Sequence, residues 1–222
     1  MIIEGRYNGP ADSGNGGWTA GTVAGALPDA AAVAVTLRIP PPLDTPFSVV
    51  AEAETIKVYA HGSTLVAEAQ PAQVDDDDVQ PVSYAEAVSI SAGYPGFAAH
   101  PFPTCFVCGP DRAPGDGMRM FPGRVADGVT ATPWIVPADV SPAMIWAALD
   151  CPGGWAVGIE ARPYVLGRMA TRIEAVPEPG SDCVVMGHLR GLDGRKAFVA
   201  STLFGPDRTV LAVSRATWIA IS

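Results

Sequence analysis

The first recurring pattern along the chain is a stripe of glycines in the stretch GGWTAGTVAGAL, residues 16–27. Gly17, Gly21 and Gly25 are four residues apart, so in a helix they share one nearly side-chain-free face. A glycine inside a helix costs up to about 1 kcal/mol relative to alanine, so three of them need a structural reason. Asn15 is a suitable N-cap before this stretch. We predict a helix here that is buried at close range against a sheet.

Strand patterns surround this helix. Apolar and β-branched residues dominate AVAVTLRI, FSVVAEAETIKVYA and STLVAEAQPA, and such runs are typical of strands. The stretch PPPLDTP breaks the chain between the first two, because proline is excluded from strand interiors. His61-Gly62 marks a hairpin turn between the last two. A further short strand is predicted in MIIEGRYNGP, which gives the order strand, helix, strand, strand, strand.

A second set of elements follows from residue 118 onward. Short strands are predicted in MRMF and GVTATPWIV, and Ser141-Pro142 is a good helix start. The stretch PAMIWAALD then carries apolar residues at helical spacing. Strands follow in LGRMATRI, DCVVMGHLRG, KAFVASTLF and VLAVSRATWIAI, and Asp193-Gly194 forms the tip of a hairpin between them.

The motif Gly-Gly-Trp occurs twice, at residues 16–18 and 153–155. Pro-rich breaks and strands follow both copies in a similar order, which favours an internal duplication. We therefore divide the chain into an N-terminal unit, a connecting segment and a C-terminal unit, at residues 1–72, 73–117 and 118–222.

The connecting segment has three parts of different character. The acidic stretch QVDDDDVQP is predicted to be solvated, and SYAEAVSISAG to form a short helix. The loop YPGFAAHPFPTCFVCGPDRAPGDG is rich in proline, glycine and aromatic residues. Loops this long are usually functional or disordered, and the aromatic residues indicate that this one packs onto the body of the protein.

Composition and charge narrow the possible functions. The 222 residues are 48% hydrophobic, enough for a substantial core, and the net charge of −9 argues against nucleic acid or an anionic membrane surface as partners. No apolar run reaches the roughly 18 residues of a membrane span, and the N-terminus lacks the pattern of a signal peptide. The 4 cysteines are too few for a disulfide scaffold in a chain of this length. We expect a cytoplasmic protein with reduced thiols.

Two parts of the chain resemble a known fold. They are NGGWTAGTVAGAL with the strands after it, and WAALDCPGG with GHLRGLDGRKAFVASTLFGPDRTVLAVSRA. Both look like the double hotdog fold, in particular the thioesterase II type of acyl-CoA thioesterase. The resemblance implies an α+β fold of two tandem hotdog units, each with a long central helix on a curled antiparallel sheet. It also implies an acyl-CoA or related thioester bound between the two helices, no cofactor, and further association into a homo-oligomer.

The first Gly-Gly pair and one acid are the leading candidates for chemistry. Backbone N–H groups of Gly16 and Gly17 at a helix start can polarise a thioester carbonyl and stabilise the developing oxyanion. Asp150 ends the apolar segment MIWAALD, where apolar neighbours and a helix C-terminus raise a carboxyl pKa. Its place matches the catalytic Asp of the thioesterase II pattern, so Asp150 is a candidate general base. The alternative is an Asp that caps the turn into CPGG.

The rest of the thioesterase II pattern is only partly present. Thr171 is the counterpart of its Thr or Ser, but the Gln near the last strand is missing from LAVSRATWI. Asn15 is a candidate to orient substrate or water, or is a helix cap only. Two hypotheses stay open: an enzyme that hydrolyses acyl thioesters, and a protein that binds acyl or other small hydrophobic ligands without cleaving them.

The tryptophans and the second Gly-Gly pair are further candidates for the binding site. Trp18 and Trp155 either line an acyl channel or belong to the core. Gly153 and Gly154 either contribute to the same site or interrupt the second helix. Two groups of basic residues are candidates for contacts with CoA phosphates: Arg112, Arg119 and Arg124, and Arg190, Arg195 and Lys196.

The connecting loop also contains a C-x2-C pair, Cys105 and Cys108, with His100 nearby. Zinc usually needs about four ligands, and Cys151 and Cys183 each stand alone in the sequence. We therefore expect buried structural thiols and predict no metal site. A third hypothesis on function makes this loop the working part of an interaction protein.

Overall fold

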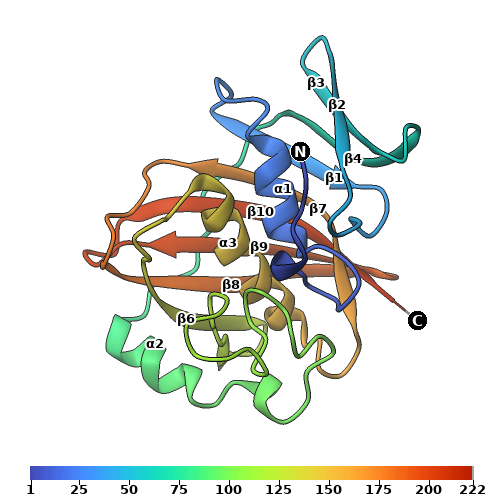
Figure 1. Cartoon of the computed structure of the whole chain (residues 1–222). Coiled ribbons are helices and arrows are strands. Elements are labelled where there is room, and N and C mark those ends of the chain that lie inside the picture. The colour runs from blue at the N-terminus through green and yellow to red at the C-terminus, as the bar shows by residue number, and fades with distance from the viewer. Residues whose placement is uncertain (222) are drawn as a thin grey trace.

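The computed structural model describes residues 1–221 as a ten-stranded antiparallel sheet with helices on both of its faces (Figure 1). Two helices, α1 (Gly16–Ala24) and α3 (Pro142–Val157), lie side by side on one face. The strands are β1 (Ala32–Leu37), β2 (Phe47–Glu52), β3 (Thr55–Ala60), β4 (Thr64–Pro71), β5 (Gly123–Ala126), β6 (Val129–Ile135), β7 (Tyr164–Ile173), β8 (Asp182–Asp193), β9 (Lys196–Phe204) and β10 (Val210–Ala220). No helix within the described residues is long and apolar enough to span a bilayer.

The order of strands repeats between the two halves of the sheet. That order is β2-β3-β4-β1-β7-β10-β9-β8-β6-β5. Strands β1 to β4 follow α1, strands β7 to β10 follow α3, and both groups have the same connectivity. The groups join through their first strands, from Ala32 opposite Arg172 to Thr36 opposite Arg168. This arrangement supports the proposed duplication; the unit boundaries at residues 72 and 117 stay a prediction.

The glycine stripe forms α1 as predicted, but its close neighbour is a helix. The Asn15 side chain caps α1 by accepting a hydrogen bond of 2.8 Å from the Trp18 amide. A Cβ on Gly21 would lie 2.7 Å from the Cβ of Trp146 on α3, closer than real Cβ contacts allow. The expectation of a sheet against this face was therefore wrong. The glycines let α1 and α3 approach each other closely.

Three predictions of strands were also wrong. Residues 1–10 contain the 3-10 helix η1 (Gly5–Tyr7) in place of a strand, and the MRMF stretch is also not a strand, because β5 begins later. FSVVAEAETIKVYA is two strands, β2 and β3, with Ala53 in the turn at φ 52°. A single alanine gives no turn signal in the sequence, since positive φ is typical of glycine.

The second Gly-Gly-Trp copy does not interrupt its helix. Ser141 caps α3, and the helix runs through Pro152 to Val157 and ends at Gly158, which has φ 85°. The carbonyl of Pro152 accepts a hydrogen bond of 2.8 Å from Thr130 Oγ1 on β6. Residues after Pro152 therefore stay helical while packed on the sheet. The two copies occupy different places, one at a helix start and the other in a last turn.

The first part of the connecting segment, residues 73–91, covers the opposite face of the sheet. Helix α2 (Tyr84–Ser91) is stabilised by a capping box between Ser83 and Glu86. It lies against β6, β5 and β8, where Ala131 and Met186 form a small core with Ala87. A second short helix, η2 (Pro95–Phe97), follows. The predicted packing of the long loop onto the body is confirmed.

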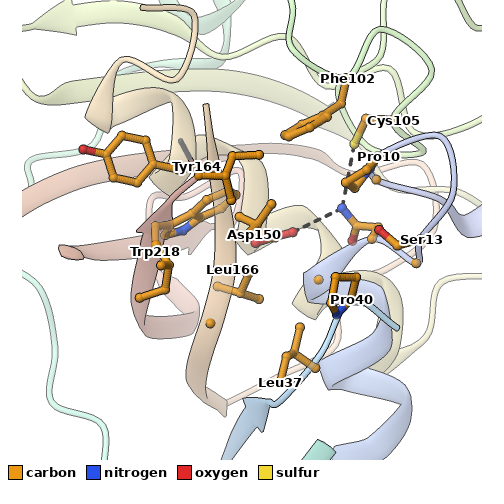
Figure 2. A pocket seen from close by; sticks show the side chains of 18 of the residues that line it. Pro10, Ser13, Leu37, Pro40, Phe102, Cys105, Asp150, Tyr164, Leu166 and Trp218 are labelled. Carbon is orange, nitrogen blue, oxygen red and sulfur yellow. Dashed lines mark hydrogen bonds between the residues drawn. The ribbon is translucent and has the colours of Figure 1, made fainter. Parts of the chain in front are cut away.

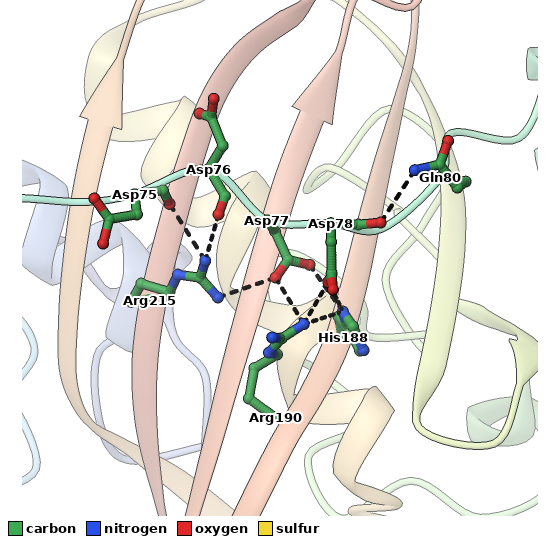
Figure 3. Close-up of polar contacts among 8 residues, drawn as sticks. All are labelled: Asp75, Asp76, Asp77, Asp78, Gln80, His188, Arg190 and Arg215. Carbon is green, nitrogen blue, oxygen red and sulfur yellow. Dashed lines mark hydrogen bonds and ion pairs between the residues drawn. The ribbon is translucent and has the colours of Figure 1, made fainter.

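The acidic stretch 75–78 is not simply solvated, because the carboxylate of Asp77 is buried and contacts basic side chains (Figure 3). The side chain of Asp77 is 0% exposed and contacts three basic groups on β8 and β10. Arg215 Nη1 donates to it at 3.0 Å, Arg190 Nη1 lies at 3.3 Å, and His188 Nδ1 at 2.9 Å. Asp77 therefore fastens the connecting segment to the sheet.

We expect Asp77→Ala to lower the free energy of unfolding by about 2 kcal/mol. Two arginines and a histidine would lose a buried partner, but all three remain partly exposed, so water compensates some of the loss. Asp75→Ala is the matched control, because the Asp75 side chain forms no ion pair with any described residue. Urea denaturation of both variants measures the effect, and equal midpoints would contradict it.

Candidate active site

A cavity of about 500 Å³ lies between the two units (Figure 2). Its wall combines the start of α1, part of α3, strands β1, β7 and β10, and the loop around residues 100–108. Ligand cavities in proteins are commonly about 300–1,000 Å³ and mostly apolar. The apolar part of this wall includes Leu37, Ile39, Phe102, Tyr164, Leu166 and Trp218. The cavity is large enough for an acyl group.

Asp150 belongs to the wall of this cavity and is 3% exposed. It reaches the start of α1 because Gly17 has no side chain. A Cβ on Gly17 would lie 2.5 Å from the Asp150 Cβ and 2.7 Å from the Trp146 carbonyl oxygen. The Gly-Gly pair of α1 thus brings a helix start and a carboxylate into contact.

The two oxygens of Asp150 have different surroundings. Oδ2 accepts a hydrogen bond of 2.9 Å from the Gly17 amide and one of 3.1 Å from Asn15 Nδ2. Oδ1 is buried and has no hydrogen-bond partner within residues 1–221. The Gly16 amide, at the first position of α1, likewise donates to no group among these residues. One oxygen is therefore fixed by two donors, and the other is buried without a partner among these residues.

Burial raises the pKa of Asp150 to about 7, and the neighbouring Cys105 adds to this increase. The hydrogen bonds from Gly17 and Asn15 act in the opposite direction, because they stabilise the carboxylate. A carboxyl group with a pKa near 7 can accept a proton and return it at neutral pH.

Asn15, Gly16, Gly17 and Asp150 therefore come together, but Thr171 does not join them. Thr171 is buried on β7, opposite Ser214 on β10, and its hydroxyl has no partner in the described chain. It is not part of the cavity wall. Its catalytic role stays a prediction.

The tryptophans of the two motifs pack against other aromatic residues outside the cavity wall. Trp18 stacks on Tyr7 with ring centroids 3.8 Å apart, and Trp155 lies edge-on to Tyr94 at 4.5 Å. Trp155 belongs to the core and Trp18 is partly buried against it, and their role in substrate binding stays a prediction.

The second Gly-Gly pair serves the packing of α3 on the sheet. A Cβ on Gly153 would lie 2.7 Å from Val199 Cγ2, and one on Gly154 would lie 2.7 Å from the Trp218 ring. Both motif copies therefore allow close approach, but against different neighbours. Their role in substrate binding stays a prediction.

One of the candidate basic residues reaches the cavity. Arg195 is part of its wall and forms no ion pair with the residues that the structure describes. By contrast, Arg112, Arg124 and Arg190 are paired with acidic side chains. Arg38, on the segment after β1, also belongs to the wall.

The cavity wall also contains a group of sulfur atoms that the sequence did not indicate. Cys151 is not alone, because α3 places it beside the C-x2-C pair: its Sγ lies 3.9 Å from Cys105 Sγ. The Sγ atoms of Cys105, Cys108 and Cys151 all lie within 4.8 Å of one another. Cys151 comes 46 residues after Cys105, so spacing along the chain gave no signal.

No protein-family model matches this chain, and no curated protein matches it. Solved structures do match. A conserved protein of unknown function with a hot dog fold from Alicyclobacillus acidocaldarius has a TM-score of 0.67 and 16% sequence identity over 100% of this chain and 92% of that chain. The tesB protein of Mycobacterium avium subspecies paratuberculosis matches with a TM-score of 0.63 and 12% sequence identity, over 96% of this chain and 89% of that chain. A protein provisionally named a thioesterase II from Thermobifida fusca matches with a TM-score of 0.63 and 12% sequence identity, over 100% of this chain and 91% of that chain.

These matches concern the fold. Each covers nearly the whole of both chains, and the same order of helices and strands occurs twice in the sheet. The chain has the double hotdog fold, as its resemblance implied. The fold is α+β, with α1 and α3 as the central helices.

Proposed function

We propose that this protein, which has the double hotdog fold, hydrolyses acyl thioesters in the cavity between its two units. One observation carries the proposal. Asp150 is a buried carboxylate in the cavity wall whose Oδ2 is anchored by Gly17 and Asn15, while Oδ1 is unpaired within residues 1–221. A general base needs this combination of a fixed position and a free oxygen.

The proposed reaction begins with a water bound at Asp150 Oδ1. Oδ1 takes one proton as the water oxygen attacks the thioester carbonyl carbon. The carbonyl oxygen becomes negatively charged and accepts a hydrogen bond from the Gly16 amide at the start of α1. The tetrahedral intermediate then collapses, the C–S bond breaks, and Asp150 returns the proton to the thiolate. The products are a carboxylic acid and a free thiol.

The wall of the cavity supports an apolar acyl or aryl group as the substrate. Leu37, Phe102 and Leu166 offer no charge, whereas Trp218 Nε1 is a buried donor without a partner in the described chain. A polar atom on the acyl group would satisfy it. Arg195 could contact a phosphate of a CoA carrier. Acyl-CoA as the carrier, a cytoplasmic location and assembly into a homo-oligomer belong to this proposal.

We expect Leu37→Trp to shorten the range of acyl groups that the protein accepts. Leu37 lies in the wall away from Asp150 (Figure 2), so a larger side chain would fill space without touching the carboxylate. The kcat/KM for long acyl-CoAs should fall at least tenfold, about 1.4 kcal/mol in the transition state, while that for acetyl-CoA changes little. Leu192→Trp, at a residue 64% exposed, is the control. An unchanged chain-length profile would contradict the assignment of the cavity.

The proposal is tested by thiol release from a panel of short, long and aryl acyl-CoAs. The purified protein should release thiol from at least one apolar member with saturable kinetics, after subtraction of its own 4 cysteines in a control without substrate. The alternative, a binder without hydrolysis, is favoured only by the absent Gln. Tight acyl-CoA binding in calorimetry with no thiol release would support it.

A further inference from the structure

The three sulfurs at the cavity wall form a compact group that the proposed hydrolysis does not use. Cys105 and Cys108 come from the loop between α2 and β5, and Cys151 comes from α3. All three side chains are buried, and all three are part of the cavity wall. None of them is in a disulfide. Three buried thiols from two distant segments thus meet at one point.

Their spacing is that of ligands around one metal ion. A tetrahedral zinc ion with Zn–S bonds of about 2.3 Å places its sulfur ligands about 3.8 Å apart. The distance from Cys105 Sγ to Cys151 Sγ is 3.9 Å, and the other two pairs lie within 4.8 Å. A disulfide would need about 2.05 Å. The C-x2-C pair is also a frequent spacing of zinc ligands.

A second, independent observation is a shell of N–H groups directed at these sulfurs. Trp155 Nε1 donates to Cys108 Sγ at 3.5 Å, and Asn15 Nδ2 donates to Cys105 Sγ at 3.7 Å. His100 Nε2 lies 3.5 Å from Cys108 Sγ. N–H donors around sulfur stabilise thiolates, the form that binds metal, and such outer contacts are typical of metal sites.

The tautomer of His100 follows from its other contact. Its Nδ1 accepts a hydrogen bond of 2.9 Å from the Phe102 amide. In a neutral ring, the hydrogen is then on Nε2, which donates to Cys108 Sγ. His100 is therefore an outer-shell donor and not a metal ligand. Cys183, on β8 opposite Trp134, also lies outside the group.

We propose that Cys105, Cys108 and Cys151 bind one Zn²⁺ ion, with the fourth position open to the cavity. Thiolate ligands favour zinc over magnesium or calcium. The ion would tie the connecting loop to α3 directly beside Asp150. It would also fix Asn15, whose side-chain nitrogen donates to both Cys105 Sγ and Asp150 Oδ2. The proposal stands independently of thioester hydrolysis, since it concerns metal content.

The test is the metal content of the full chain, produced without a polyhistidine tag in zinc-supplemented medium and purified under reducing conditions. Mass spectrometry should find about one zinc per chain in the wild type and in Cys183→Ser. In Cys105→Ser and Cys151→Ser the zinc content should fall below about a tenth of this value. His100→Gln should keep the ion but bind it roughly tenfold more weakly.

Cobalt(II) gives a readout that does not depend on how well the variants retain zinc. Titration of the metal-free wild type should produce thiolate-to-cobalt charge-transfer absorption, and Cys151→Ser should reduce it. A wild-type protein that unfolds cooperatively, contains no zinc and gives no such absorption would overturn the proposal. The three residues would then be buried structural thiols.

Discussion

Asp150→Asn should lower kcat for thioester hydrolysis by roughly a thousandfold while the protein stays folded. The amide oxygen can still accept the hydrogen bonds from Gly17 and Asn15 that Oδ2 accepts now. The amide nitrogen at the other position cannot take a proton from water. The anchor is thus preserved, and only the basic oxygen is lost.

The stability of Asp150→Asn distinguishes a loss of the catalytic base from a loss of folded protein. A buried charge is costly even when hydrogen-bonded, and burial already raises the pKa of Asp150 to about 7. Replacing it with a neutral side chain should leave the denaturation midpoint unchanged or higher. Full activity in Asp150→Asn would exclude the acid as the base. An equal loss of activity and stability would show that Asp150 acts mainly as a link between α1 and α3.

Gly17→Ala should have the largest effect on the fold among glycine substitutions in α1. The new Cβ would lie 2.5 Å from the Asp150 Cβ and 2.7 Å from the backbone oxygen of Trp146. Because the backbone of α3 cannot move aside without disturbing the sheet packing, we expect a loss of at least about 3 kcal/mol in unfolding free energy. The carboxylate would also shift, so kcat/KM should fall roughly a hundredfold.

Gly25→Ala is the matched control for this substitution. Gly25 follows the same spacing but is exposed at the end of α1, where a Cβ would meet only the Thr22 and Gly21 carbonyl oxygens at 3.3 and 3.8 Å. Its φ of −58° suits alanine. Urea denaturation and kinetics of both variants give the comparison. Similar behaviour of the two would contradict the close contact between α1 and α3.

The sequence predicted the helices and most strands because these depend on local patterns. The glycine stripe, the cap at Asn15 and the alternating strands all belong to short windows of sequence. Contacts between residues that are distant in the sequence cannot be predicted from such windows. The same stripe did not indicate that α3, rather than the sheet, lies against Gly17 and Gly21.

Only those residues of the candidate site that stand out in a local pattern were predicted. Asp150 stood out through its apolar neighbours, and Gly16-Gly17 through their place at a helix start. Cys151 was undervalued, because only the tertiary fold brings it to Cys105. Asp77 was likewise hidden in a run of four acids, since the arginines that bury it come from β8 and β10. Local pattern gives the elements and the chemistry on each; packing decides which residues meet.

If Asp150 directs water onto a thioester, the oxygen of that water should appear in the acid product, and a single turnover in ¹⁸O-labelled water can detect it. Excess protein is mixed with an acyl-CoA that it hydrolyses, and the acid product is analysed by mass spectrometry. We expect one ¹⁸O atom in the product of the first turnover, because the attacking oxygen comes from water. An unlabelled acid in the first turnover would contradict it, since the oxygen would then come from the carboxylate of Asp150 itself.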